Sequence, residues 1–308
     1  MSVETAVRTR YATAAQTPEP ALCCAVSYPA QLLAAIPREV IDCDYGCGDP
    51  SRYLKPGETV LDLGCGAGKI CFIASQVVGP AGRVIGVDMS DEMLAVARRN
   101  APHVAQNIGY ANTTFRKGRI QDLALDLDAL DAALTAQPIA GLQGYLRAEQ
   151  IAAQLRAEQP LVADASVDVV VSNCVLNLVE PTAKRTLFAE LHRVLKPGGR
   201  AVISDIVSSH DVPQALQRDP ELWSGCISGA FREDLFLRAF ADAGFAPVRI
   251  LKREATPWRV VGGIEFRALT VEAEKPAAAR KPAELRPPIF LQSPIAVQPE
   301  GGCCNGNC

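Results

Sequence analysis

The sequence lacks three features that would each point to a function: an excess of positive charge, a long apolar run, and histidines spaced as metal ligands. Lys and Arg number 31 against 34 Asp and Glu, so no basic field attracts a phosphate backbone and we expect no nucleic-acid partner. No stretch approaches the ~18 apolar residues of a membrane-spanning helix, and the first 20 residues contain no apolar signal core. These absences predict a cytoplasmic protein with no membrane partner.

Cysteine is abundant where histidine is scarce. Eleven cysteines, an odd number in a chain without an export signal, argue against a disulfide scaffold and for thiols kept reduced in the cytosol. The three histidines, His103, His192 and His210, have no spacing typical of ligands. The cysteines beside glycine or in pairs are therefore candidates for chemistry, although a free cysteine is most often a small core residue.

Strand-like and helix-like segments alternate from residue 59 onward. Short apolar, β-branched runs are typical of buried strands, and apolar residues every three to four positions are typical of helices. Strands are expected at 59–63, 83–88, 112–117, 166–174 and 201–205, and helices at 70–78, 90–99 and 182–195. Ser90 is the expected N-cap of the second helix. The alternation predicts an α/β fold with a mostly parallel sheet and helices on both faces.

Composition divides the chain into segments around this sheet. Residues 1–44 are expected as a loosely packed arm with one short helix and the pair Cys23 and Cys24, and residues 45–209 as the main domain. Within that domain, 123–163 reads as a helical surface insertion. Residues 210–272 are expected as a small α+β cap on the edge of the sheet. Repeated prolines in 273–308 predict a disordered linker that ends in a cysteine-rich tail.

Three glycines follow the first strand in the run VLDLGCGAGK, residues 60–69. Gly64, Gly66 and Gly68 let the backbone approach a ligand where a Cβ would block it. The run lacks the GxGxxG spacing that brings a pyrophosphate onto a helix N-terminus, and the carboxylate of Asp62 repels phosphate but accepts hydrogen bonds from an ammonium group. Asp88 ends the second strand, where an acid binds both ribose hydroxyls. The pattern predicts a nucleoside site without phosphate.

These motifs, with the KPGG run at 196–199, resemble those of class I methyltransferases that use S-adenosylmethionine, over Thr59 to Asp205. The resemblance implies a Rossmann-like methyltransferase fold for 45–209, with S-adenosylmethionine as its cofactor. It implies that Asp88 holds the ribose, Ile120 flanks the adenine and Asn173 lies near the methionine part. The implied cofactor residues are Asp62, Gly64, Cys65, Gly66, Gly68, Asp88, Met89, Ile120 and Asn173. A purely structural glycine turn and a nicotinamide site are the alternatives.

Three cysteines stand beside glycine or just past a strand end: Cys47 in YGCGD, Cys174 in SNCVLNL and Cys226 in SGCISGA. Open sheets bind ligands at the carboxyl ends of their parallel strands, so Cys174 is expected within reach of the cofactor's methyl group. Cys47 and Cys226 are expected to fold over the same edge. Three converging thiolates form a soft, trigonal site. Cys65 and Cys71 have no partner signal and are expected to pack in the core.

The three cysteine motifs resemble those of arsenite methyltransferases. The resemblance implies that Cys47, Cys174 and Cys226 bind trivalent arsenic, and that a further cysteine, which is Cys23, Cys24 or Cys43, joins a disulfide during turnover. It implies re-reduction by a thiol donor such as thioredoxin or glutathione, and a role in arsenic detoxification. Two features depart from the family's pattern, the long insertion and the cysteine-rich tail. The tail cysteines Cys303, Cys304 and Cys308 either capture the metalloid or belong to a dispensable extension.

The expected chemistry is methyl transfer to the arsenic lone pair, with the nucleophile about 3 to 3.5 Å from the methyl carbon. Thiolate-bound trivalent arsenic carries that lone pair without losing a proton, so no general base is required. Two other functions remain open on the sequence alone. One is methyl transfer to another small acceptor, a selenium or tellurium species or an organic molecule. The other is a non-catalytic, thiol-rich protein that sequesters metalloid.

Overall fold

The computed structural model describes residues 3–17, 19, 26–43 and 45–277. The cysteine pair of the arm and the three tail cysteines therefore lie outside the described residues, and so do the expectations attached to them. Within the described ranges no helix is long and apolar enough to cross a membrane.

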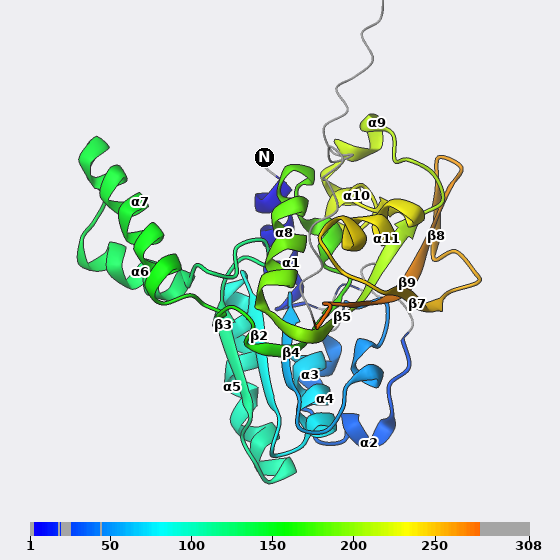
Figure 1. Ribbon diagram of the computed structural model, residues 1–308, viewed down its shortest axis with the longest axis horizontal. Coiled ribbons are helices and arrows are strands. Elements are labelled where there is room, and N and C mark those ends of the chain that lie inside the picture. Colours follow the sequence, from blue (N-terminus) through cyan, green and yellow to red (C-terminus); the bar gives the residue numbers. More distant parts are fainter. Residues whose placement is uncertain (1–2, 18, 20–25, 44, 278–308) are drawn as a thin grey trace, which may run out of the picture.

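A single sheet organises the described part of the chain (Figure 1). Its strands are β1 Thr59–Leu63, β2 Arg83–Asp88, β3 Thr113–Lys117, β4 Val167–Asn173, β5 Leu195–Ser208, β6 Phe231–Arg232, β7 Val248–Arg253, β8 Arg259–Val261 and β9 Ile264–Glu274. The main order is β3-β2-β1-β4-β5-β9-β7, with β6 beside β5 and β8 beside β9. β1 to β6 pair in parallel, whereas β9 runs antiparallel to β5, β7 and β8. The predicted mostly parallel sheet is confirmed.

Helices cover both faces of the sheet, as predicted. They are α1 Val3–Ala14, α2 Ala30–Leu33, α3 Arg38–Asp42, α4 Lys69–Val78, α5 Asp91–Ile108, α6 Leu127–Ala136, α7 Gly141–Glu158, α8 Pro181–Val194, α9 Gln214–Gln217, α10 Pro220–Ser224 and α11 Glu233–Asp242. The expected N-cap of α5 is confirmed, because the Ser90 hydroxyl accepts a hydrogen bond from the Met93 N–H.

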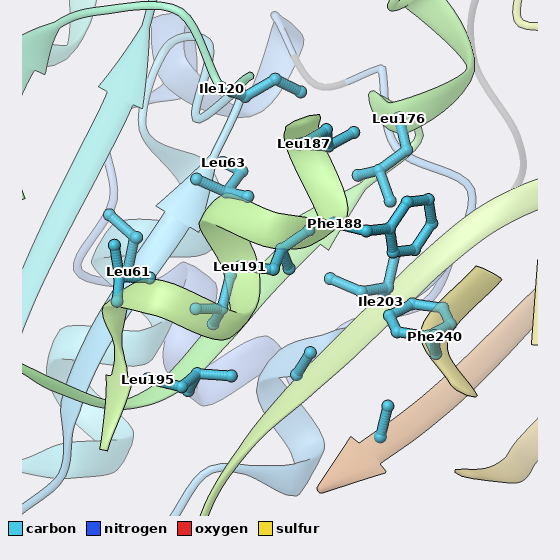
Figure 2. Close-up of a cluster of buried hydrophobic side chains, with 14 of the residues drawn as sticks. Leu61, Leu63, Ile120, Leu176, Leu187, Phe188, Leu191, Leu195, Ile203 and Phe240 are labelled. Carbon is cyan, nitrogen blue, oxygen red and sulfur yellow. The ribbon is translucent and has the colours of Figure 1, made fainter. Parts of the chain in front are cut away.

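The core has two halves because successive side chains of a strand point to opposite faces. Leu61 and Leu63 of β1 pack with Leu187 and Leu191 of α8 on one face (Figure 2). Val60 packs on the other face, in the cluster that contains the α4 side chains. Burial on both faces explains why the central strands read as continuous apolar runs.

The N-terminal arm is better packed than expected. α1 is twelve residues long and packs against α10 and α5, with Val7 and Ala14 buried. The Arg10 guanidinium donates hydrogen bonds to the Glu221 carbonyl and the Ser224 hydroxyl of α10. The expectation of a loose arm missed this helix because its apolar residues are few and its partner lies more than 200 positions away in the sequence.

The segment 210–272 is only partly a cap. α9 and α10 lie beyond the sheet, but β7 and β9 extend the sheet itself, and β9 pairs with β5 from Arg200–Glu274 to Ser208–Phe266. β9 continues to Glu274, where the Lys275 N–H donates to the Gly199 carbonyl. The boundary expected at 272–273 therefore falls inside a strand, because β9 stays paired with β5 as far as Glu274 and the first proline of the tail, Pro276, comes only after the strand ends.

The insertion forms a helical hairpin, α6 and α7, which projects away from the sheet (Figure 1). α6 has no buried residue and α7 buries only Gly144. The hairpin is anchored at its base, where Leu123, Leu125, Leu161 and Val162 are buried. The prediction of a helical surface insertion is confirmed.

Candidate active site

A cavity of about 170 Å³ opens at the carboxyl ends of β1, β2 and β4. The residues that line it include Asp62, Gly64, Cys65, Gly66, Asp88, Met89, Ile120 and Asn173, all of which the sequence placed at the cofactor. Two of the arsenic-ligand candidates lie apart from this lining, but Cys174 belongs to it. The cavity therefore joins the nucleoside motif to the first of the three thiols.

Two glycines of the glycine-rich loop, Gly64 and Gly66, line the cavity, as expected of positions where the backbone approaches a ligand. Gly64 and Gly66 have φ of +66° and +53°, a conformation that side chains rarely adopt. A Cβ on Gly64 would also lie 2.4 Å from Cγ1 of Val175. The Gly66 N–H donates to the carboxylate of Asp88 over 2.8 Å, which ties the loop to the end of β2.

Gly68 does not line the cavity, contrary to expectation. It is the N-cap of α4, with φ of +91°, and a Cβ there would lie 2.9 Å from the Phe115 ring. Alternate glycines in a tight turn point in different directions, so the third glycine serves the entry into the helix and its packing.

Two carboxylates give the cavity its electrostatic character. Asp62 is buried, 2% exposed, and accepts a hydrogen bond from the Cys71 thiol over 3.2 Å. Burial raises the pKa of Asp88, although the N–H groups of Ser90 and Gly66 counteract that effect by donating to its carboxylate. Two acids facing one cavity disfavour phosphate and suit a ligand that brings hydroxyl and ammonium donors.

Cys65 and Cys71 pack under the glycine-rich loop. Both are buried in the same apolar cluster, and burial raises the pKa of the Cys65 thiol to about 11. Such thiols are protonated at neutral pH and unreactive. The structure thus agrees with the expected packing role of both residues, while Cys65 also lines the cavity.

Cys47, Cys174 and Cys226 come together, as predicted. They are 5%, 6% and 4% exposed and share one apolar cluster with Ile206 and Phe266. The thiols of Cys47 and Cys226 both influence the pKa of the Cys174 thiol, which is the sign of mutual contact within the cluster. The sulfur atoms of Cys174 and Cys226 and a carboxylate oxygen of Asp205 all lie within 4.8 Å of one another. We name Cys47, Cys174 and Cys226 the thiol cluster; its role as an arsenic site stays a prediction.

Two thiols of the cluster, Cys174 and Cys226, hold their protons at neutral pH. Contact with Cys226 lowers the pKa of Cys174, but contact with Cys47 and burial outweigh it and keep that pKa well above its ordinary value. Contact with Cys174 and burial raise the pKa of Cys226 in the same direction. Cys174 and Cys226 are therefore neutral thiols that lie side by side in an apolar pocket.

The backbone at the cluster is strained. Three non-glycine residues in the described ranges have positive φ, and Cys174 at +66° and Cys226 at +61° are two of them. Strain of this kind persists only where the surroundings impose it, and it concentrates at functional sites. Here the Cys174 N–H is held by the Ser204 carbonyl over 2.8 Å, and the Cys226 N–H by the Trp223 carbonyl over 3.0 Å.

Asp205 fixes the chain just after Cys174. Its buried carboxylate accepts hydrogen bonds from the Leu176 N–H and the Asn177 side chain, each over 2.8 Å. Burial raises the pKa of Asp205 to about 6. The Lys184 ammonium, whose pKa burial lowers to about 8, donates to the Gly229 carbonyl and so braces the loop that follows Cys226.

Asn173 fixes the loop that carries Cys47. Its side-chain oxygen accepts from the N–H groups of Cys47 and Gly48 over 2.9 and 3.0 Å, and its nitrogen donates to the Gly48 carbonyl over 2.8 Å. The sequence placed Asn173 near the methionine part of the cofactor. It does line the cavity, but its amide is engaged by the loop.

Sequence reasoning missed Tyr11, Asp205 and Lys184. Tyr11 of α1 lines the cavity, and its hydroxyl counteracts the rise in the pKa of the Cys226 thiol. No sequence signal marks it, because it lies in the arm. The sequence did contain a signal for the other two residues. Asp205 is an acid at the end of an apolar strand, and Lys184 is a lysine among the apolar positions of α8; both are buried.

Comparison with known proteins identifies the family. The family described as a methyltransferase domain matches residues 54–154 and 136–244. A solved arsenic(III) S-adenosylmethionine methyltransferase from Chlamydomonas reinhardtii is 31% identical, with a TM-score of 0.62, over 84% of this chain and 75% of that one. The chain belongs to the arsenite methyltransferase family. The predicted family and its α/β methyltransferase fold are confirmed.

Curated arsenite methyltransferases are similar over most of this chain. The protein from Halobacterium salinarum is 40% identical over 77% of this chain and 52% of its own length. The protein from Mus musculus is 32% identical over 73% of this chain and 51% of its own length. This member of the arsenite methyltransferase family thus spans about half the length of the curated relatives it matches.

Proposed function

We propose that this chain transfers methyl groups from S-adenosylmethionine to trivalent arsenic held by Cys47, Cys174 and Cys226. The observation that carries the proposal is the position of Cys174, which belongs both to the cavity lining and to the thiol cluster. A substrate bound by the cluster is therefore next to the cavity that the glycine-rich loop builds. Methyl transfer requires this adjacency.

The cavity fits S-adenosylmethionine by its chemistry. Gly64 leaves no room for a Cβ, and Asp62 and Asp88 present acceptors that suit an ammonium group and ribose hydroxyls but repel phosphate. We assign Asp88 to the ribose, Ile120 to the adenine and Asp62 to the ammonium group, with Met89 and Cys65 in the wall. When bound, S-adenosylmethionine supplies an electrophilic methyl group on a sulfonium centre.

The thiol cluster suits arsenite because Cys174 and Cys226 are neutral thiols and arsenite is a neutral molecule. Each thiol gives its proton to one hydroxide of As(OH)₃, so three As–S bonds form, three As–O bonds break and three water molecules leave. The raised pKa values of Cys174 and Cys226 favour this balance, since no thiolate charge is left buried. The product is a pyramidal arsenic that keeps its lone pair.

The chain's own residues then position the arsenic and exclude water. Ile206 and Phe266 are fully buried beside the cluster, so the hydroxide ligands are replaced in an apolar environment. The lone pair is the nucleophile, so the reaction needs no general base, and histidine is unnecessary at the site. The hydrogen bonds that impose positive φ on Cys174 and Cys226 keep the two sulfurs in place before arsenic binds.

Turnover requires a thiol donor such as thioredoxin or glutathione to return oxidised cysteines or arsenic to the reduced state. We place the enzyme in the cytoplasm, where such donors keep thiols reduced, and assign it to arsenic detoxification. Cys43 is buried, and its thiol points at the carbonyls of Ala14 and Ala15 over 3.9 and 3.8 Å. Of the three disulfide candidates it is the one within the described residues.

One assay tests the function. Purified protein is incubated with arsenite, methyl-labelled S-adenosylmethionine and a thiol reductant, and the arsenic species are separated. We expect labelled methylarsenicals from the natural chain and none from Cys174→Ser, which still binds S-adenosylmethionine. Full methylation by Cys174→Ser contradicts the proposal.

The same assay separates the alternatives. Tight arsenite binding without labelled product identifies a sequestering protein. Labelled product from a selenium, tellurium or organic acceptor but not from arsenite identifies a different methyltransferase. Cys71→Ser is the matched control, because that buried cysteine lies in the other core cluster and serine retains the hydrogen bond to Asp62.

A further inference from the structure

The Asn173 side chain, at the end of β4, reaches into the loop that carries Cys47. We propose that Asn173 is a positioning residue for Cys47, and that through Cys47 it supports the use of inorganic arsenic, which takes three thiols, more than the use of arsenic that already carries a methyl group, which takes two. The inference rests on the proposed function, since it concerns how the thiol cluster recognises its substrate. It assigns Asn173 to the substrate loop and not to the cofactor.

The hydrogen-bonding capacity of the Asn173 amide is used up within the protein. An asparagine amide offers two acceptor positions and two donor positions. The oxygen accepts from the N–H groups of Cys47 and Gly48, and the nitrogen donates to the Gly48 carbonyl and, over 3.3 Å, to the Tyr28 hydroxyl. The residue as a whole is 9% exposed. It has no hydrogen-bonding position left for a cofactor.

We call the three hydrogen bonds between the Asn173 amide and the Cys47 loop the Asn173 clamp. The glycines on both sides of Cys47 leave room for this clamp. A Cβ on Gly46 would lie 2.0 Å from the Asn173 nitrogen, and a Cβ on Gly48 would lie 2.5 Å from the Ser204 hydroxyl. Real Cβ atoms do not come so close, so the loop lies flat on the ends of β4 and β5 only because both positions are glycine. The two glycines of the YGCG motif are therefore needed for the close approach of the loop to Asn173.

The clamp matters for Cys47 because the other two thiols have independent supports. Cys174 directly follows β4 and is followed by the turn that Asp205 holds, while Cys226 follows α10 and its loop is braced by Lys184. Cys47 lies between α3 and the 3₁₀ turn Pro50–Tyr53, outside any helix or strand. Loss of the Asn173 amide therefore releases the third thiol and leaves the first two in position.

Displacement of Cys47 should affect arsenite and methylarsonous acid differently, because the two substrates bind different numbers of thiols. Arsenite, As(OH)₃, has three hydroxides to exchange, releases three waters and uses all three thiols. Methylarsonous acid, CH₃As(OH)₂, has two hydroxides to exchange, so it releases two waters and needs two thiols. A chain with a displaced Cys47 discriminates against arsenite and retains the methylated species on Cys174 and Cys226.

The experiment is a double-mutant cycle of Asn173→Leu and Cys47→Ser, with kcat/KM measured for arsenite and for methylarsonous acid. We expect Asn173→Leu to lower kcat/KM for arsenite about tenfold or more and that for methylarsonous acid less than about threefold. In Cys47→Ser, the added Asn173→Leu should have no further effect, because residues that act through each other are not additive. Tyr28→Phe removes the longest of the four bonds and also the bond that the Tyr28 hydroxyl donates to the Gly48 carbonyl over 3.1 Å, but it keeps the bonds between Asn173 and the loop, so it should stay near the natural chain.

A second readout does not depend on arsenic. Hydrogen exchange at the amides of Cys47 and Gly48 should accelerate in Asn173→Leu, while the Kd for S-adenosylmethionine stays within about threefold. Unchanged exchange at these amides, additive effects in the cycle, or a selective loss of cofactor affinity each overturns the inference. Failure of the natural chain to methylate arsenite instead overturns the proposed function, and the exchange measurement then still decides the role of Asn173.

Discussion

The Cys226 thiol donates a hydrogen bond to the carbonyl oxygen of Cys174 over 3.2 Å, and both residues have positive φ. Cys174 follows the central strand β4, whereas Cys226 follows α10, so the contact joins the sheet to the helices above it. The unusual backbone of Cys174 turns its carbonyl toward Cys226 while its own thiol faces Cys47 and Cys226. An unfavourable backbone conformation at Cys174 and Cys226 thus accompanies the contact between these two residues.

Cys226→Ser should lower the rate of arsenite methylation roughly a hundredfold, because a hard oxygen replaces one soft ligand and the arsenic is no longer aligned. Initial rates with saturating S-adenosylmethionine measure the effect. Cys71→Ser should retain most of the natural rate. Equal rates for the two serine variants would contradict the role of Cys226 as an arsenic ligand.

Asp88→Asn should raise the Kd for S-adenosylmethionine about tenfold or more, because an amide cannot accept hydrogen bonds on both sides as the carboxylate does. Either the Gly66 N–H or the Ser90 N–H would also lose its acceptor, because asparagine keeps only one side-chain oxygen. Isothermal titration measures the affinity, and arsenite binding without cofactor should be unchanged. Asp91→Asn, at an exposed ion pair with Lys117, is the control. Similar affinities for both variants would refute the assignment of Asp88.

The α6–α7 hairpin should be dispensable for folding. The Leu161 N–H donates to the Ala124 carbonyl and the Val162 N–H to the Leu123 carbonyl, so the ends of the insertion are already joined. Replacing 127–158 with a short Gly/Ser linker should change the free energy of unfolding by only about 1 kcal/mol. Leu123→Ala, at the fully buried base, should cost about 3 kcal/mol. Urea denaturation measures both, and a larger loss from the hairpin deletion than from Leu123→Ala would contradict the account.

Lys184 should make stability depend on pH above neutrality. Burial lowers its pKa from the ordinary 10.5 to about 8, so between these values the unfolded chain binds a proton that the folded chain does not. The free energy of unfolding should therefore rise as pH goes from about 8 to 10.5, by at most about 3 kcal/mol for this group. Lys184→Met removes the group. Denaturation profiles of the two proteins that run parallel over this pH range would contradict the burial of a charged Lys184.

The fold was predictable where local pattern and burial coincide. The runs at 59–63, 83–88 and 167–173 are apolar on both faces because they occupy the middle of the sheet, and the Ser90 cap is a local signal. β9 was harder to place, since membership in the sheet depends on antiparallel pairing with β5, some 65 residues earlier in the chain. α1 likewise owes its packing to α10.

The candidate site was predictable where residue type alone limits the chemistry. Glycines after a strand and cysteines at strand ends placed the cavity and the thiol cluster, because the carboxyl edge of a parallel sheet is shared by all its strands. The orientation of single side chains was not predictable. Gly68 faces Phe115, Asn173 is engaged by the Cys47 loop, and Tyr11 reaches the cluster from the arm. Each depends on contacts between segments remote in sequence.

The number of sulfur atoms bound to arsenic tests the central claim most directly. X-ray absorption at the arsenic K-edge, recorded on the purified chain with one equivalent of arsenite and no added thiol, measures that number. The account predicts three arsenic–sulfur bonds and no arsenic–oxygen bond in the natural chain, and two sulfurs in Cys226→Ser. An arsenic centre that keeps its oxygen ligands in the natural chain, or three sulfurs that survive in Cys226→Ser, would contradict it.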